Sequence, residues 1–279
     1  MRHIPKPTLE IDNIIKVSTS NMRNNGDQKY INAIPVIEEY SKIHDDKMKN
    51  HLGYQLSTHE EVTSDVGTKE MIKLYSDKFS KEGQPGRKFY DKILIAAPRG
   101  VCPYCGIGIA VTLDHYFPKA LYPKLAVTPQ NLLPSCRDCN TEKKEKVFSN
   151  LEDMPIHPYY EEVQSFDWLT AKIISTSPLC VKYAVDDAVT DPILKQRLDT
   201  HMKIFKLYEC YAIKASEEVI AIKYQLEKVF LAGGEDELKK YIFEIYESSY
   251  NNEKNSWRTA LYRALLDTSK YVTDTKLLL

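Results

Sequence analysis

Four cysteines arranged as two Cys-x-x-Cys pairs constrain the fold of this chain more than any other feature. The first pair is Cys102 and Cys105, the second is Cys136 and Cys139, and thirty residues separate them. Cysteines at this spacing present both sulfurs to one ion, and two such pairs complete a tetrahedral Cys₄ zinc site. A site with four protein ligands has no open position. We therefore expect a structural zinc ion around which residues 99–150 fold.

The remaining composition is that of an ordinary globular protein, with 43% hydrophobic and 28% charged residues in a chain of 279. That length is sufficient for one large or two modest domains. The N-terminus lacks the apolar core of a secretory signal, and no apolar run is long enough to span a bilayer. We therefore expect a cytoplasmic protein without membrane contact, in which clustered cysteines bind metal. Cys180 and Cys210 stand alone and are expected to be buried apolar residues.

The charge of the chain is unevenly distributed, although its formal net charge is −1. Residues 87–146 carry ten Lys and Arg against five Asp and Glu, whereas the flanking segments are near neutral or acidic. Positive charge around the cysteines is the sign needed to approach phosphates. The excess is modest, and by itself it indicates only a solvated surface.

The pattern of apolar residues predicts an α+β fold that is predominantly helical, in three regions. The expected regions are an N-terminal helical region (1–98), a central module (99–150) and a C-terminal region (151–279) with a short β-hairpin followed by helices. Expected helices are 34–52, 71–79, 87–97, 137–150, 192 to about 230, 236–249 and 256–267. Expected strands are 107–113, 132–133, 168–175 and 181–185, with a proline-containing loop at 116–130.

Three polar positions accompany the cysteines in the central module. Asp114 and His115 follow the first predicted strand, and Asn140 opens the predicted helix directly after the last cysteine. If strand and helix pack side by side, the oxygens of Asp114 and Asn140 could share one hard cation, Mg²⁺ or Mn²⁺, beside His115. The alternative is a zinc ribbon that only binds nucleic acid, in which these polar residues are incidental.

The order Asp114-His115, Asn131, Cys136-x-x-Cys139-Asn140-x-x-Lys143 resembles the motif of HNH nucleases, the ββα-metal or His-Me finger class. The resemblance covers about fifty residues. Asn140 stands where the name of the motif has its last His, which is a common variant in that family. The resemblance implies a ββα-metal fold with the zinc beneath the site.

The resemblance also implies roles for individual residues. His115 would be the general base, Asp114 and Asn140 would hold the catalytic divalent ion, and Asn131 would brace the loop that orients His115. Further candidate contacts to nucleic acid in this basic segment are Lys143, Lys144, Arg99 and Arg87. A neutral imidazole is able to take a proton from water near pH 7, which fits the role of His115.

A weaker resemblance extends beyond the motif. Four short stretches are similar to HNH proteins of bacterial anti-phage operons, such as the nuclease subunit of Septu-type systems, which works with an ATPase. They are Arg87-x-Phe-Tyr-Asp, Leu113-Asp-His-Tyr-Phe-Pro-Lys119, Tyr122-Pro and His157-Pro-Tyr-Tyr. The resemblance implies a nuclease effector in a defence complex, with an ATPase partner docked on the C-terminal helices.

These observations predict a metal-dependent endonuclease that hydrolyses phosphodiester bonds in DNA. Two other functions remain open at this point. The same site could cut RNA, as a ribonuclease or tRNase effector. The chain could also be a non-catalytic zinc module that binds nucleic acid, although binding alone does not require the Asp114, His115 and Asn140 set.

Overall fold

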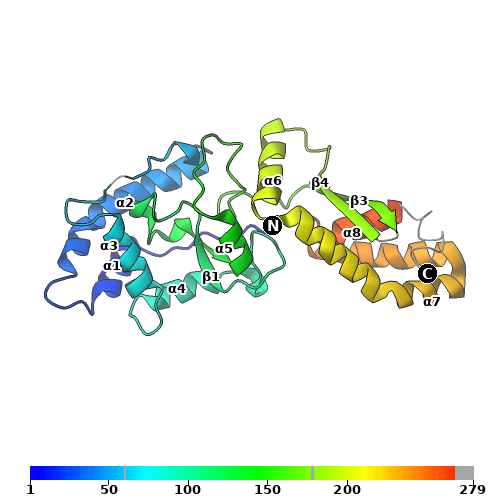
Figure 1. Ribbon diagram of the computed structural model, residues 1–279, viewed down its shortest axis with the longest axis horizontal. Coiled ribbons are helices and arrows are strands. Elements are labelled where there is room, and N and C mark those ends of the chain that lie inside the picture. The colour runs from blue at the N-terminus through cyan, green and yellow to red at the C-terminus, as the bar shows by residue number, and fades with distance from the viewer. Residues whose placement is uncertain (60, 177–178, 268–279) are drawn as a thin grey trace. The chain divides into compact units, whose positions relative to one another are not determined.

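A computed structural model describes residues 1–59, 61–176 and 179–267 of the chain (Figure 1). The contacts divide it into two compact units, one of residues 2–162 and one that begins at Val163 and includes Met1. The division into three regions made from the sequence stays a prediction. Among the described residues, none of the helices combines the length and apolar character needed to cross a bilayer.

The first unit begins with helices that pack around one apolar core. Its helical segments before the cysteines are α1 (Ile11–Thr19), α2 (Gln28–Lys49), η1 (Gly53–Gln55), α3 (Thr68–Lys73), η2 (Leu74–Phe79), α4 (Arg87–Leu94) and η3 (Pro98–Gly100). Helix α2 starts six residues before the predicted position 34 and carries Pro35 in its interior. The proline removes one backbone donor, but burial of Tyr30, Ile34 and Ile37 on one face stabilises the helix across it.

The continuous helix formed by α3 and η2 changes geometry at Leu74. The segment from Leu74 to Phe79 is π-helical, and both Tyr75 and Phe79 lie in the core. π-Helical turns are rare and occur frequently at functional sites. The turn places the Tyr75 ring against the central module.

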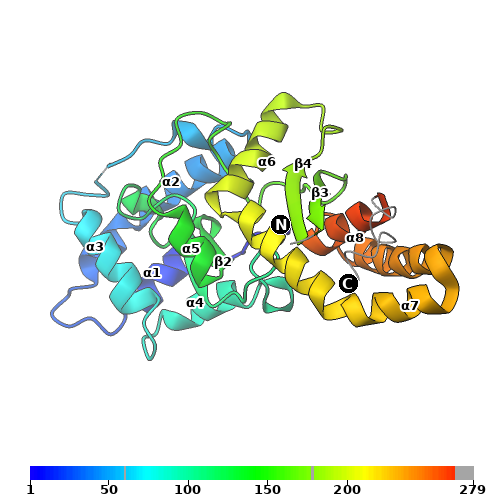
Figure 2. The ribbon, with the colours of Figure 1, turned by 45° about the vertical axis from the view of Figure 1, so that its right-hand side comes forward.

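The central module has the predicted order of strand, strand and helix. Strand β1 (Thr112–His115) pairs antiparallel with β2 (Leu132–Ser135), so that His115 lies opposite Leu132. Two short turns, η4 (Pro123–Leu125) and η5 (Pro129–Asn131), lie in the connection, and α5 (Arg137–Lys143) follows and packs on β1. Figure 2 shows α5 and β2 from a second side.

Two boundaries of this module differ from the prediction. The first strand starts at Thr112 instead of 107, because Ile109 forms only an isolated bridge with Val101. Helix α5 ends at Lys143 instead of 150, because Lys144 adopts a φ of +54° that a helix does not tolerate.

In its described residues, the second unit contains the predicted hairpin and three helices. Strands β3 (Leu169–Thr176) and β4 (Leu179–Val185) are antiparallel, and they are followed by α6 (Pro192–Ile204), α7 (Leu207–Asn252) and α8 (Trp257–Asp267). Helix α7 includes Gly234, whose φ of +70° breaks the helical geometry. Figure 1 shows the chain reversing direction within α7. The predicted helix end at Gly233 and Gly234 corresponds to this break.

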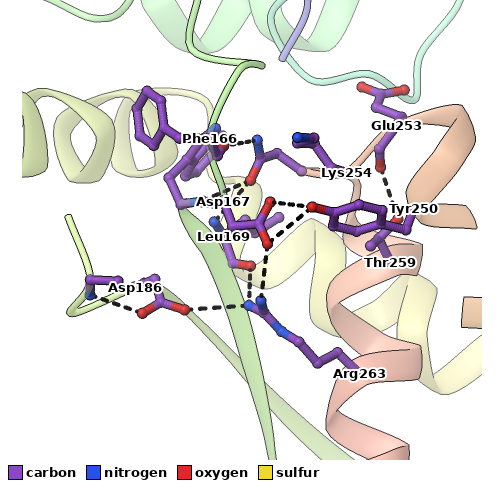
Figure 3. Close-up of polar contacts among 12 residues, drawn as sticks. Phe166, Asp167, Leu169, Asp186, Tyr250, Glu253, Lys254, Thr259 and Arg263 are labelled. Atoms are coloured by element: carbon purple, nitrogen blue, oxygen red, sulfur yellow. Dashed lines mark hydrogen bonds and ion pairs between the residues drawn. The ribbon is translucent and has the colours of Figure 1, made fainter. Parts of the chain in front are cut away.

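Polar contacts attach α8 to the hairpin (Figure 3). The guanidinium of Arg263 donates to the Leu169 carbonyl oxygen at 2.9 Å and lies 3.4 Å from the Asp186 carboxylate. The Tyr250 hydroxyl donates to Asp167 at 3.2 Å. These contacts hold the two-stranded sheet on its helices.

The expectation that Cys180 and Cys210 are buried was wrong. Cys180 is exposed and Cys210 is half-buried. Side chains alternate along β4. Cys180 and Lys182 lie on its exposed face, and Val181 and Tyr183 point to the core.

Candidate active site

The four paired cysteines form one buried cluster. Their sulfur atoms all lie within 4.8 Å of one another. The Cys105 and Cys136 sulfurs are 3.9 Å apart. Four sulfurs placed tetrahedrally at a Zn–S distance of about 2.3 Å are separated by roughly 3.8 Å. The cluster therefore has the dimensions and the ligand type of a closed metal site.

The backbone around the cluster supports sulfur atoms that carry negative charge. The N–H of Gly108 donates to Cys105 Sγ at 3.3 Å, and the N–H of Cys139 donates to Cys136 Sγ at 3.5 Å. Hydrogen bonding with Cys102 lowers the pKa of the Cys105 thiol and raises that of the Cys136 thiol. A Cβ on Gly108 would meet Cys136 Sγ at 2.8 Å, so the turn approaches the sulfurs too closely for any side chain. These features fit a resident zinc ion.

His115, at the end of β1, is held in one orientation by its neighbours. Its Nε2 lies 2.9 Å from the Ala126 carbonyl oxygen. Because a carbonyl only accepts, Nε2 carries the proton and Nδ1 keeps its lone pair. Burial, followed by the positive charge of Lys119, lowers the pKa of His115 to about 3, and the bond to Ala126 opposes this shift. The imidazole is therefore neutral at pH 7.

Asp114 and Asn140 are brought to one face of β1. Thr112 and Asp114 alternate onto the same side of the strand, and the Asn140 amide on α5 donates to Thr112 Oγ1 at 3.4 Å. The Asp114 carboxylate is buried and accepts a hydrogen bond from the Tyr104 hydroxyl at 2.8 Å. Burial raises the pKa of Asp114, and the Lys143 charge opposes the rise. A carboxylate and an amide oxygen on facing elements are a donor set suited to Mg²⁺ or Mn²⁺.

Asn131 lies fully buried behind this site. Its side-chain oxygen accepts from the Phe117 N–H at 2.8 Å, and its amide donates to the carbonyl oxygens of Phe117 at 2.9 Å and Leu125 at 3.2 Å. The backbone of Asn131 also accepts from the Tyr116 N–H at 2.9 Å. Asn131 thus holds both ends of the loop that follows His115 and leads to Ala126.

The structure does not support the phosphate contact expected of Lys143. Its side chain is 1% exposed. The ammonium donates to the carbonyl oxygens of His115 at 2.6 Å and Tyr116 at 3.1 Å, and lies 3.4 Å from Asp114 Oδ1. These contacts occupy its three donors, and a phosphate has no access to a side chain that faces into the module. Lys143 therefore connects α5 to the end of β1.

The other predicted contacts to nucleic acid differ in their surroundings. Lys144 and Arg99 are exposed, and both have positive φ. Arg87, at the start of α4, donates to the Asp91 carboxylate at 2.7 Å and the Ser80 carbonyl oxygen at 2.9 Å. Contact with nucleic acid stays a proposal for Lys144 and Arg99. The guanidinium of Arg87 is instead occupied by Asp91 and Ser80.

Two residues near His115 were not among the predicted site residues. The Tyr75 ring centroid lies 4.4 Å from that of His115, and Lys119 Nζ lies 5.3 Å from the Tyr75 ring centroid. Lys119 was visible in the motif, four residues after His115, but was given no role. No sequence signal connects Tyr75 with His115, because tertiary packing alone brings η2 to β1.

Residues 102–146 match the family model described as HNH endonuclease. The matched segment contains the cysteine cluster and the Asp114, His115, Asn131 and Asn140 positions. The chain therefore carries an HNH nuclease domain, and the recognition made from the motif is confirmed.

Two curated proteins are similar to the chain over different lengths. Protein ea31 of Escherichia phage lambda is 29% identical over 225 residues, which cover 72% of this chain and 73% of ea31. The Septu protein PtuB of Bacillus thuringiensis is 31% identical over 81 residues, which cover 25% of this chain and 32% of PtuB. The chain thus matches about a third of PtuB. No solved structure matches the chain significantly.

Proposed function

We propose that this protein is a metal-dependent endonuclease that hydrolyses phosphodiester bonds in DNA. The observation that carries the proposal is the fixed tautomer of His115. Its Nε2–H is directed to the Ala126 carbonyl oxygen, so Nδ1 keeps its lone pair and is available as a base, and His115 directly follows Asp114 at the end of β1.

In the proposed reaction, His115 Nδ1 takes a proton from a water molecule as the water oxygen attacks phosphorus. The bond from phosphorus to the 3′-oxygen breaks, and this oxygen then acquires a proton from solvent. The products are a 5′-phosphate and a 3′-hydroxyl. Asp114 and Asn140 would hold Mg²⁺ or Mn²⁺, which neutralises charge on the phosphate oxygens when bound. Asn131 keeps the loop after His115 in place.

We assign a structural role to a zinc ion held by Cys102, Cys105, Cys136 and Cys139. Closed Cys₄ sites leave no position for water or substrate. The first cysteine pair precedes β1, Cys136 caps α5 and Cys139 lies in the first turn of that helix, so the ion would fix the strand and the helix that carry the catalytic groups.

We further propose that the protein is the cytoplasmic nuclease effector of a bacterial anti-phage defence system, acting with an ATPase partner. The similarity to the Septu protein PtuB supports this proposal. Before its break at Gly234, helix α7 also exposes the large apolar side chains of Ile213, Ile220, Tyr224 and Leu231, at spacings that place them on one helical face. A purified chain that stays monomeric at high concentration and cuts DNA freely without a partner would contradict the proposal.

The test of the nuclease function is cleavage of plasmid DNA with Mg²⁺, Mn²⁺ or EDTA. Wild-type protein is expected to cut only with a divalent ion. His115→Ala is expected to reduce the rate by at least the roughly 10²–10⁴-fold typical of a lost general base. The exposed His51→Ala variant is the matched control.

The outcomes of this test separate the alternatives. Cleavage by His115→Ala at the wild-type rate excludes the proposed mechanism. Cleavage of RNA or tRNA but not DNA by the wild-type protein indicates the ribonuclease alternative. Nucleic-acid binding without cleavage of any substrate, with or without a partner, indicates the non-catalytic zinc module.

A further inference from the structure

We propose that Lys119 binds the substrate phosphate beside His115, and that Tyr75 positions Lys119 for this contact. The inference rests on the nuclease function proposed above. It gives the site a phosphate-binding cation in place of Lys143, and it assigns part of the site to a helix outside the HNH domain.

Three side chains lie next to one another along this part of the site. The Tyr75 ring meets the His115 ring at an interplanar angle of 66° with 4.4 Å between centroids. Lys119 Nζ lies 5.3 Å from the Tyr75 ring centroid, a distance at which an ammonium ion is attracted to an aromatic ring. The Tyr75 ring therefore lies next to both His115 and Lys119.

Glu145, Asp114 and Lys143 are the charged groups that act on Lys119. The Lys119 ammonium and the His115 ring both lie against the Tyr75 ring, at 5.3 Å and 4.4 Å from its centroid.

Among the described residues no carboxylate lies within ion-pair distance of Lys119, although Glu145 and Asp114 raise its pKa, and the side chain is half-buried. Burial lowers the pKa of Lys119, which shows that the charged form is held at a cost. Binding of an anionic ligand would offset this desolvation. A phosphate diester is the anion that the proposed reaction brings to the site.

Lys143 does not fill this role, because its three donors are committed to His115, Tyr116 and Asp114. During attack by water, negative charge increases on the non-bridging phosphate oxygens. A fixed ammonium beside these oxygens stabilises that charge more in the transition state than in the ground state. Lys119 would thus contribute to rate as well as to binding.

Tyr75 comes from the π-helical turn η2, 27 residues before the matched domain begins at residue 102. Its side chain is 9% exposed and is also stacked on Phe79 at 5.5 Å. The N-terminal helices therefore contribute a side chain to the site, and residues 102–146 alone do not contain that side chain.

The test measures DNA cleavage and binding by Lys119→Gln, Lys119→Arg and a control. Lys124→Gln is the matched control, because Lys124 Nζ also lies over an aromatic ring, 5.0 Å from the Tyr40 centroid. Lys119→Gln is expected to lower kcat/KM by about 10²-fold with bound zinc unchanged. Lys119→Arg is expected to recover part of the loss, and Lys124→Gln to cut at the wild-type rate.

Binding of a duplex oligonucleotide in the His115→Ala background gives a readout independent of cleavage. Loss of one phosphate contact is expected to reduce the slope of log affinity against log salt concentration by about one. Wild-type kcat/KM together with an unchanged salt slope in Lys119→Gln would overturn the inference while leaving the nuclease function intact. If the wild-type protein cuts nothing, with or without a partner, the nuclease proposal fails, and an unchanged salt slope, or no binding, overturns this inference as well.

The positioning role of Tyr75 has its own test. Tyr75→Phe keeps the ring and is expected to retain nearly full activity, whereas Tyr75→Leu is expected to approach the Lys119→Gln rate and salt slope. A Tyr75→Leu variant that loses rate with an unaltered salt slope would mean that Tyr75 only supports the fold.

Discussion

The ammonium of Lys143 lies 2.6 Å from the carbonyl oxygen of His115, and this contact joins the last turn of α5 to the strand end that carries the base. The same ammonium lies 3.4 Å from the Asp114 carboxylate, with both groups at most 5% exposed. One lysine therefore fixes the backbone of the proposed base and neutralises the proposed metal ligand. Its contribution to catalysis would pass through these two residues.

Lys143→Met is expected to lower the free energy of unfolding by about 3–5 kcal/mol, because it leaves a buried carboxylate without its cation. Urea unfolding measures this loss. Lys146→Met, at an exposed position three residues later, is the control and is expected to change stability by less than about 0.5 kcal/mol. The double variant Lys143→Met with Asp114→Asn should regain part of the stability but none of the activity. A Lys143→Met protein as stable as wild type would contradict the proposed stabilisation of the contact between α5 and β1 by Lys143.

Asn131→Asp is expected to reduce both stability and cleavage while zinc stays bound. The carboxylate still accepts from the Phe117 N–H, but it has no donors for the carbonyl oxygens of Phe117 and Leu125. Leaving a buried acceptor unsatisfied costs about 1–3 kcal/mol per group. Thermal unfolding and kcat on plasmid DNA measure the two effects. Asn150→Asp is the control, because exposed Asn150 only accepts there, from the Asp153 N–H; equal effects of the two changes would refute the bracing role.

Cys136→Ser is expected to release the bound metal and to unfold the central module. Structural zinc contributes on the order of 10 kcal/mol of apparent binding free energy, which is also folding free energy. Metal analysis of the purified protein and its thermal unfolding are the measurements. Cys180→Ser, at an exposed position in the other unit, should keep the metal and the melting temperature. Full zinc content in Cys136→Ser would exclude the Cys₄ assignment.

The sequence was sufficient for the parts of the site that depend on local spacing. The cysteine pairs, the position of Asp114 and His115 on the first strand and that of Asn140 on the helix each follow from residues close together in the chain. Spacing also placed Lys143 one helical turn after Asn140. It did not give the direction of a long side chain, and the structure turns that lysine inward to backbone oxygens.

Residues contributed by distant segments were beyond the reach of sequence patterns. Tyr75 lies forty residues before His115, and its helical periodicity indicates only a core residue. Pro35 and Gly234 show the same limit for the fold. Each is a local helix breaker, yet helix α2 continues through the proline because its apolar face is buried, whereas the chain reverses at the glycine.

His44 gives a prediction about pH that does not involve the catalytic groups. It lies fully buried on α2, with its ring 5.6 Å from that of Phe117 and 6.2 Å from that of Tyr160. Neither ring nitrogen has a hydrogen-bond partner among the described residues. Burial, reinforced by Lys6 and opposed by Asp45, lowers the pKa of His44 to about 4.

Because the folded pKa of His44 is below its unfolded value of about 6.5, the unfolded chain binds more protons between pH 6.5 and pH 4. His44 therefore stabilises the fold least at low pH, and its contribution falls by about 2 kcal/mol from pH 7 to pH 5. His44→Phe is expected to remove that part of the pH dependence of the unfolding free energy, whatever its effect at pH 7. Parallel stability curves for wild type and His44→Phe between pH 5 and pH 7 would show that His44 is protonated equally in the folded and unfolded states.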